Sequence, residues 1–131
     1  GCLRLMTSLT REYAKQRKQL GKAIAEFQVI QHRLVDMFMN TEESVSMALL
    51  ATLKLDASDE ERARAVSAAK VSIGRASRFV GQSAVQIHGG MGVTDEMRVG
   101  HYFKRTTMLD STFGNVDSHL KRYAALTPKA A

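Results

Sequence analysis

The chain has 131 residues, which is the size of one domain and is long enough to bury a hydrophobic core without disulfides. A single cysteine, Cys2, and the lack of any apolar run near the roughly 20 residues of a membrane span exclude a disulfide scaffold and a membrane protein, so we expect a soluble, cytoplasmic chain with no membrane partner. The formal net charge of +6 is spread among acidic residues without a basic run, which argues against nucleic-acid binding.

The first helical pattern covers residues 3–17, where apolar residues recur every three or four positions from Leu5 to Tyr13. No capping side chain precedes it, so we expect that the chain was cut from a longer protein. Gly21 is predicted to end this helix, and Arg17 lies among cations near that end, where the helix dipole favours positive charge.

A second helix is predicted over residues 26–55, about 45 Å long at 1.5 Å per residue. Its apolar stripe passes through Ile30, Met37 and Leu49, and its other methionines, such as Met39, are predicted to fill the core.

A third helix is predicted to start at the capping box Ser58-Asp59-Glu60-Glu61, in which the Ser58 hydroxyl accepts from the Glu61 backbone N–H. Its apolar stripe then continues at steps of three and four to Ile87. Glycine destabilises a helix, so Gly74 or Gly81 is expected to allow a close backbone contact with a neighbouring helix.

This third helix leads directly into Gln86-Ile87-His88-Gly89-Gly90-Met91-Gly92. Closely spaced glycines let another group approach the backbone, which is typical of a binding loop. The same glycines are equally typical of a helix C-cap, and on glycines alone the C-cap is the favoured interpretation, with His88 as a polar group at the helix end.

After the loop, Thr94 is predicted to cap a short helix that reaches residue 102, and residues 104–107 are predicted to break the pattern. A last, less regular helix is predicted over 108–123, interrupted at Gly114-Asn115, and residues 127–131 are predicted to form a frayed tail. With no strand pattern, the predicted fold is all-α: an up-and-down four-helix bundle with a short extra helix, forming one domain over residues 1–126.

The bundle has no complete catalytic set of its own. The histidines are far apart in sequence and show no zinc-ligand spacing, so we predict no metal site; they are His32, His88, His101 and His119. The residues alone therefore indicate a helical bundle that contributes glycines and cations to a ligand.

Two motifs identify a family. The segment Arg17-Lys18-Gln19-Leu20-Gly21-Lys22, followed by Phe27-Gln28, resembles the Arg-x-x-Phe-Gly-Lys and Phe-Gln segment of the acyl-CoA dehydrogenase family. The stretch from Gln86 to Gly92 is similar to the Gln-x-x-Gly-Gly-x-Gly loop of that family. The resemblance covers residues 3–123 and matches only the C-terminal helical domain, so the N-terminal helical domain and the middle β domain of the family are missing.

The resemblance implies an FAD cofactor, held in part across a subunit interface of a homo- or heterotetramer. Arg17 is expected to meet the FAD pyrophosphate, Gln28 the adenosine half, and the stretch from Gln86 to Gly90 the ADP portion in a neighbouring subunit. Leu20 replaces the usual aromatic residue, which should weaken stacking more than phosphate binding. The positions assigned to FAD are Arg17, Lys18, Gln19, Phe27, Gln28, Gln86, Ile87, His88, Gly89, Gly90, Asn115, Val116 and Asp117, and Gly114 is assigned to the acyl-CoA substrate.

The sequence departs from the family at the catalytic position. Many members carry Tyr-Glu-Gly-Thr, where the glutamate removes the substrate α-proton, and the matching residues here are Thr112-Phe113-Gly114-Asn115. Phenylalanine cannot act as a general base, so no catalytic residue is assigned. Asp110 and Asp117 would have to be redirected by local structure to replace it.

Three accounts of the missing base remain. The base lies upstream of Gly1, or a partner subunit supplies it, or the protein binds flavin or acyl-CoA without dehydrogenation. The favoured function is the C-terminal segment of an FAD-dependent acyl-CoA dehydrogenase of fatty acid metabolism, inactive as this chain alone, with an electron-transfer partner that the sequence leaves open. A helical assembly module and, more weakly, a nucleic-acid-binding bundle are the alternatives, and the apolar surface of the long helices predicts tetramer contacts.

Overall fold

The computed structural model describes residues 1–127 and is almost entirely helical. The long elements are α1 (Cys2–Gln16), α2 (Gln28–Leu53), α3 (Asp59–His88), α4 (Arg98–Ser111) and α5 (Val116–Leu126). Between α1 and α2 lie two short strands, β1 (Lys18–Gln19) and β2 (Lys22–Ala23), and a 3-10 turn, η1 (Ile24–Glu26); a second 3-10 turn, η2 (Gly89–Val93), joins α3 to α4.

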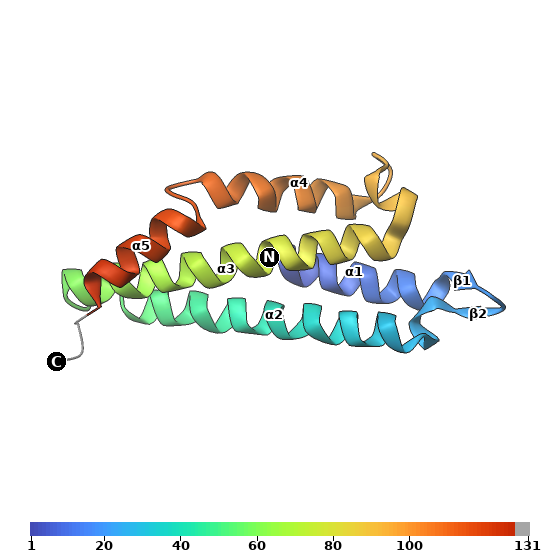
Figure 1. Ribbon diagram of the computed structural model, residues 1–131, viewed down its shortest axis with the longest axis horizontal. Helices are drawn as coiled ribbons and strands as arrows, with labels where there is room; N and C mark the ends of the chain where they lie inside the picture. Colours follow the sequence, from blue (N-terminus) through green and yellow to red (C-terminus); the bar gives the residue numbers. More distant parts are fainter. Residues whose placement is uncertain (128–131) are drawn as a thin grey trace.

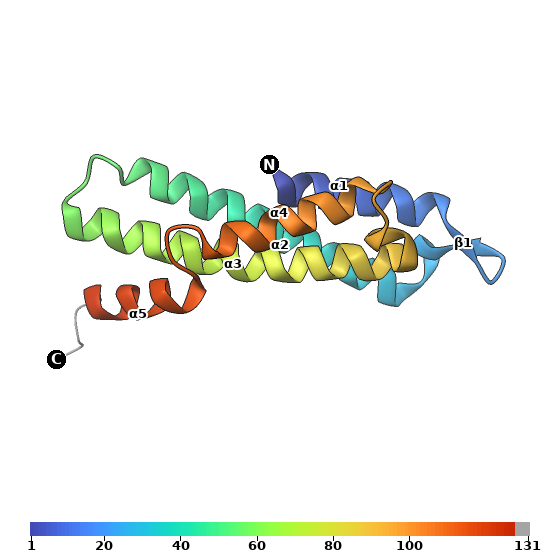
Figure 2. The ribbon, with the colours of Figure 1, turned by 90° about the horizontal axis from the view of Figure 1, so that it is seen from above.

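The first four helices run alternately up and down along a common axis, with α3 in the middle (Figure 1). Helix α3 contacts each of the other four helices, and α5 continues beyond α4 along its far half (Figures 1 and 2). The β1–β2 hairpin, η1 and η2 all lie at one end of the bundle, which we call the hairpin end. The predicted all-α bundle with a short extra helix is confirmed.

A small core links the four bundle helices. Met6 of α1, Met37 of α2, Val80 of α3 and Val99 of α4 are almost completely removed from solvent. Burial of such side chains is the main source of stability in a bundle of this size. The core follows the predicted apolar stripe along the second half of α3, and the stripes of α1 and α2 only in part, since Leu5 of α1 is exposed.

The prediction that Gly21 ends the first helix is wrong. Helix α1 ends at Gln16, and Gly21 lies instead in the two-residue turn of the β1–β2 hairpin. Leu20 and Gly21 both have positive φ angles, 50° and 81°, the combination that a tight hairpin turn requires. Strands of two residues leave no alternating pattern in the sequence, which is why this small sheet was not predicted.

The predicted core stripe of α2 is correct for its first half only. Met37 is buried, whereas Met39 and Leu49 are exposed, so their assignment to the core is wrong. For Leu49 the cause is the length of α1, which has 15 residues against 26 in α2. Helix α1 therefore covers only the part of α2 nearer the hairpin end, and the far half of α2 extends beyond α1 alongside α3 (Figure 2).

Helix α3 begins as predicted, since the Ser58 hydroxyl accepts a hydrogen bond from the Glu61 N–H at 3.3 Å. The expected close contacts at its glycines are also confirmed. A Cβ at Gly74 would lie 2.4 Å from a methyl carbon of Val116, and one at Gly81 would lie 2.5 Å from the Phe103 ring. These two glycines let α5 and α4 pack directly against α3.

Helix α4 corrects two predictions. It begins at Arg98 rather than after Thr94, because the Thr94 hydroxyl donates backwards to Met91 O at 2.9 Å and closes η2. Helix α4 also continues through residues 104–107, where Thr106 and Thr107 each donate a hydroxyl hydrogen bond to Phe103 O. This local bonding lets threonines remain inside a helix.

Helix α5 starts at Val116, directly after the predicted interruption at Gly114-Asn115. Of the predicted frayed tail, only Thr127 belongs to the described residues, where it caps α5; residues 128–131 lie outside them. Within residues 1–127, no helix combines the length and hydrophobicity of a membrane span, and no three metal-ligating side chains gather at one place.

Candidate functional site

A groove of about 810 Å³ opens at the hairpin end of the bundle. It lies between the end of α1, the hairpin and η1 region, the start of α2, and the junction of α3 with η2. We call it the hairpin-end groove. Its lining residues are Tyr13, Arg17, Gln19, Ile24, Phe27, Val29, Ile30, Arg33, Gln86, Ile87, His88, Gly89, Gly90, Met91 and Thr94.

Local backbone hydrogen bonds fix one wall of the groove. The N–H of Ile24 donates to Arg17 O at 2.8 Å and closes the hairpin at its base. The N–H of Ala23 donates to the Glu26 carboxylate at 3.1 Å, which holds η1 in place ahead of α2. The Lys22 ammonium lies 4.3 Å from the centre of the Phe27 ring, a cation–π distance.

Two arginines give the groove its charge. Arg17 follows the last residue of α1, and Arg33 lies on the second turn of α2, so they reach the groove from different helices. Neither takes part in the ion pairs found within residues 1–127. Two guanidinium groups without acidic partners are well suited to bind phosphate oxygens.

A stacked pair of rings lies beneath the groove. The His88 ring is 4.2 Å from the Tyr13 ring, and His88 is only 3% exposed. His88 Nδ1–H donates to Ala84 O at 2.8 Å, which leaves Nε2 as an acceptor with no partner in the described part of the chain. Burial lowers the pKa of His88 below its ordinary value, so the ring is neutral at pH 7. His88 is therefore a buried group that packs on Tyr13, and as the last residue of α3 it is also a polar group at the helix end, as expected.

Gly90 and Gly92, which follow α3, differ in whether the surrounding structure leaves room for a side chain. A Cβ at Gly92 would lie 2.9 Å from Val85 O, so glycine is needed there for packing on α3. At Gly90 φ is not positive, and a Cβ would meet nothing within 4 Å. The chain's own packing thus gives no reason for glycine at position 90, which favours the approach of a ligand to this backbone.

The predicted FAD residues between Arg17 and Gly90 form a first group, and the structure brings most of them together in one groove. The residues that line the hairpin-end groove are Arg17, Gln19, Phe27, Gln86, Ile87, His88, Gly89 and Gly90. Lys18 and Gln28 are exposed and lie outside its lining. Sequence reasoning missed Tyr13 and Arg33; the spacing of Val29 and Arg33, four residues apart on one helix face, was the available signal.

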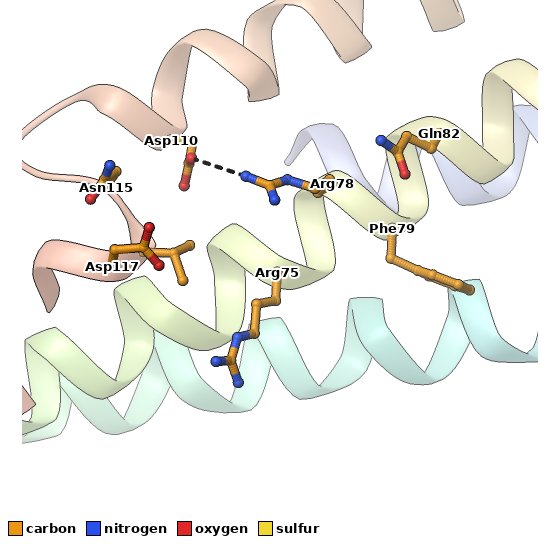
Figure 3. Close-up of a pocket in the computed structure, with 8 residues that line it drawn as sticks. Arg75, Arg78, Phe79, Gln82, Asp110, Asn115 and Asp117 are labelled. Atoms are coloured by element: carbon orange, nitrogen blue, oxygen red, sulfur yellow. Dashed lines mark ion pairs between the residues drawn. The ribbon is translucent and has the colours of Figure 1, made fainter. Parts of the chain in front are cut away.

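The second group of predicted residues lies elsewhere. Asn115, Val116 and Asp117 line a separate pocket of about 350 Å³ between α3, the end of α4 and the start of α5 (Figure 3). Arg75, Arg78, Phe79 and Gln82 of α3 and Asp110 of α4 complete it. No motif in the sequence marks these α3 residues, although Arg75 and Arg78 share one helix face.

Charges in this second pocket partly neutralise one another. Arg78 points toward Asp110, with 3.9 Å between a guanidinium nitrogen and Oδ2, whereas Arg75 points away (Figure 3). Asp110 Oδ1 is buried and has no hydrogen-bond partner among residues 1–127. Asn115 Oδ1 accepts from the Ser118 N–H at 2.9 Å, so this side chain caps α5.

Phe113 and Gly114 lie in the loop that joins α4 to α5. The Phe113 side chain is 94% exposed and has a positive φ of 58°, and it lines neither the pocket of Figure 3 nor the hairpin-end groove. Gly114 follows with φ 96° and lies against the His119 ring. The position that the resemblance gives to the catalytic base is thus an exposed aromatic residue on a sharply turned loop.

Comparison with known protein families gives a match over residues 1–125 to "Acyl-CoA dehydrogenase, C-terminal domain". Among curated proteins, the chain is similar to "Acyl-CoA dehydrogenase IpdE2" of Mycolicibacterium smegmatis. The two are 31% identical over 117 residues, which cover 89% of this chain and 36% of the relative.

Solved structures show the same fold. The "ChsE4-ChsE5 complex from Mycobacterium tuberculosis" superposes with a TM-score of 0.89 at 27% identity and covers 98% of this chain and 35% of the other. The "FAD complex of PigA" superposes with a TM-score of 0.85 at 27% identity, covering 94% and 32%. The chain therefore spans about a third of the length of the proteins that it matches.

Proposed function

The chain belongs to the acyl-CoA dehydrogenase family, and we propose that it is the C-terminal helical domain of an FAD-dependent acyl-CoA dehydrogenase. In this proposal, the complete protein is a cytoplasmic enzyme of fatty acid or related acyl metabolism that oxidises an acyl-CoA thioester between its α and β carbons. The chain alone is inactive. The observation that carries the proposal is the hairpin-end groove, where Arg17, Phe27 and the stretch from Gln86 to Gly90 meet from three separate segments.

The groove fits part of FAD by its chemistry. Arg17 and Arg33 are two forked donors without acidic partners, which suits a pyrophosphate. Gln19 and Gln86 offer amide groups that can orient a ribose or a base, and Phe27 gives an apolar face. Gly90 leaves its backbone open to a close neighbour. FAD held here would supply the acceptor for the β-hydrogen, which leaves the substrate as a hydride.

The proton at the α carbon needs a base that this chain does not provide at position 113, because phenylalanine has no titratable group. Asp110 faces Arg78 in the pocket of Figure 3, on the α3 side of the loop, and Asp117 lines the same pocket. Within the proposal, the base therefore comes from the part of the protein upstream of Gly1.

A second candidate is a base-less subunit of a heteromeric acyl-CoA dehydrogenase. Phe113 favours it, and so does the similarity to a chain of the ChsE4–ChsE5 complex, which by its title contains two different proteins. The exposed apolar side chains along α2, among them Phe38 and Leu53, supply a surface for subunit contacts in either a homo- or a heterotetramer.

The test uses the full-length protein that contains this chain. We expect it to purify with a flavin absorbance spectrum that bleaches when an acyl-CoA thioester is added. Bleaching only after co-expression with a partner subunit would support the second candidate. A full-length protein that binds no FAD, with or without a partner, would contradict both.

A pair of variants tests the groove itself. Arg17→Met removes a charged donor, so we expect FAD to bind about tenfold to a hundredfold more weakly, measured by flavin release on dilution. Lys15→Met is the matched control, because Lys15 is an exposed cation on the last turn of α1 that pairs with Glu12 and lies outside the groove. Equal FAD affinity in both variants would remove Arg17 from the site.

A further inference from the structure

The loop between α4 and α5, residues 112–115, is held at several points by side chains from outside it. The Lys70 ammonium, on α3, donates to Thr112 O at 2.9 Å and to the carbonyls of Leu109 and Asp110 at 3.3 Å. These carbonyls lie at the C-terminal end of α4, where the helix dipole favours a cation, and Leu109 O also accepts from the Thr112 N–H at 3.3 Å.

His119 holds the same loop from the other side. Its Nε2 donates to Phe113 O at 2.9 Å, because a carbonyl oxygen can only accept. Its Nδ1 is 3.2 Å from the Ser67 hydroxyl of α3, which fixes the ring. His119 and Ser67 are both buried, so the bond to Phe113 O is anchored in the packed interface of α3 and α5.

These contacts explain a backbone that the Phe113 side chain itself disfavours. A residue with a Cβ is strained at a positive φ, and the 94% exposed Phe113 ring makes little contact that could compensate. A Cβ at Gly114 would lie 3.2 Å from His119 Nε2, so the ring of His119 also restricts what can follow Phe113.

We propose that Lys70 and His119 are positioning residues that set the conformation of the loop at residues 112–115, whatever side chain stands at position 113. This inference rests on the proposed function. In an acyl-CoA dehydrogenase, position 113 is that of the catalytic base, and here the chain keeps the hydrogen bonds that hold the backbone at this position although the base itself is absent. A carboxylate introduced at 113 would then be presented on the same backbone as Phe113.

Hydrogen–deuterium exchange on the full-length protein tests this without any need for activity. We expect Lys70→Met to speed exchange of the amides of Thr112, Ser118 and His119 about tenfold or more, because it removes charge-assisted hydrogen bonds to the loop. Lys70→Arg, which keeps a cationic donor, should restore most of the protection. Phe113→Glu should leave these amides within about twofold of the parent protein.

Lys121→Met is the control, since Lys121 is an exposed cation on α5 that makes none of the hydrogen bonds to the loop described above; it should leave exchange unchanged. Should Lys70→Met fail to fold, His119→Leu tests the second contact in the same way. Unchanged loop exchange in both Lys70→Met and His119→Leu would overturn the proposal, as would faster loop exchange in Phe113→Glu. Failure of the proposed function appears separately, as the absence of flavin from the parent protein.

Discussion

Two buried histidines show how the two ends of α3 differ. His119 packs against the α5 end of α3 and has both ring nitrogens paired, one with Ser67 and one with Phe113 O. His88 lies under the hairpin-end groove with Nδ1 paired and Nε2 without a partner in the described chain. The buried histidine at the α5 end thus has both ring nitrogens paired within the chain, while the one under the groove has only one paired.

The same contrast holds for cations. Lys70 gives its hydrogen bonds to three carbonyls of its own chain, whereas Arg17 and Arg33 face the groove without an acidic partner among residues 1–127. Polar groups that stabilise a fold are normally paired within the chain, so cations that lack an acidic partner are candidates for binding a ligand.

The largest change in the free energy of unfolding is expected for Gly74→Ala, where α3 contacts α5. Gly74→Ala places a Cβ 2.4 Å from a Val116 methyl carbon and 2.8 Å from Asp110 Oδ1, so α3, α4 and α5 must separate. We expect a loss of about 2 kcal/mol in the free energy of unfolding despite the better helix propensity of alanine. Urea unfolding followed by circular dichroism measures it.

Gly90→Ala is the matched change at the groove end. A Cβ there meets nothing within 4 Å, so we expect the free energy of unfolding to stay within about 0.5 kcal/mol while FAD affinity falls. Equal destabilisation by Gly74→Ala and Gly90→Ala would show that the two ends do not differ in packing.

Most of the helices could be predicted from the sequence, and the features that could not be predicted depend on tertiary packing or are too short to leave a pattern. The α3 stripe and its Ser58 cap are local patterns, so they were predicted correctly. The exposure of Leu49 depends on where α1 stops beside α2, which no property of α2 reveals. The two-residue strands are too short to show a period.

The candidate site divides in the same way. Arg17, Phe27 and Gln86 were identified because motifs carry them, and the structure brings them into one groove. Asn115 and Asp117 lie in a different pocket, and the sequence could not predict this because it depends on how α5 packs against α3. Lys70 and His119 carry no motif, and only their hydrogen bonds reveal their role.

A pH dependence is expected from the groove end. Burial lowers the pKa of His88 from its ordinary value of 6.5, so below that pH the unfolded chain binds a proton that the folded chain does not. Stability is therefore full above about pH 6.5 and falls as the pH drops toward the folded pKa, by at most about 1.4 kcal/mol per pH unit. Urea unfolding as a function of pH measures the slope.

His88→Leu should remove this part of the slope, whatever it does to the stability at neutral pH. His32→Gln is the control, because His32 is exposed on α2 and should leave the slope unchanged. A His88→Leu protein with the slope of the parent would show that His88 is protonated equally in the folded and unfolded chain.

The last comparison is between Leu20 in the hairpin turn and Phe113 in the loop at residues 112–115. Leu20, like Phe113, is an almost fully exposed apolar residue with a positive φ, here 50°, but none of the side-chain hydrogen bonds within residues 1–127 reaches the hairpin turn to hold it. Leu20→Asn suits the turn, so we expect a gain of about 0.5–1 kcal/mol in the free energy of unfolding. Leu20→Ala keeps a strained Cβ and should give no gain. If Leu20 also contacts the bound cofactor, FAD affinity will fall in Leu20→Asn while stability rises. That result would mean that the strained backbone at Leu20 is retained for binding. At Phe113, by contrast, the strained backbone is imposed by Lys70 and His119.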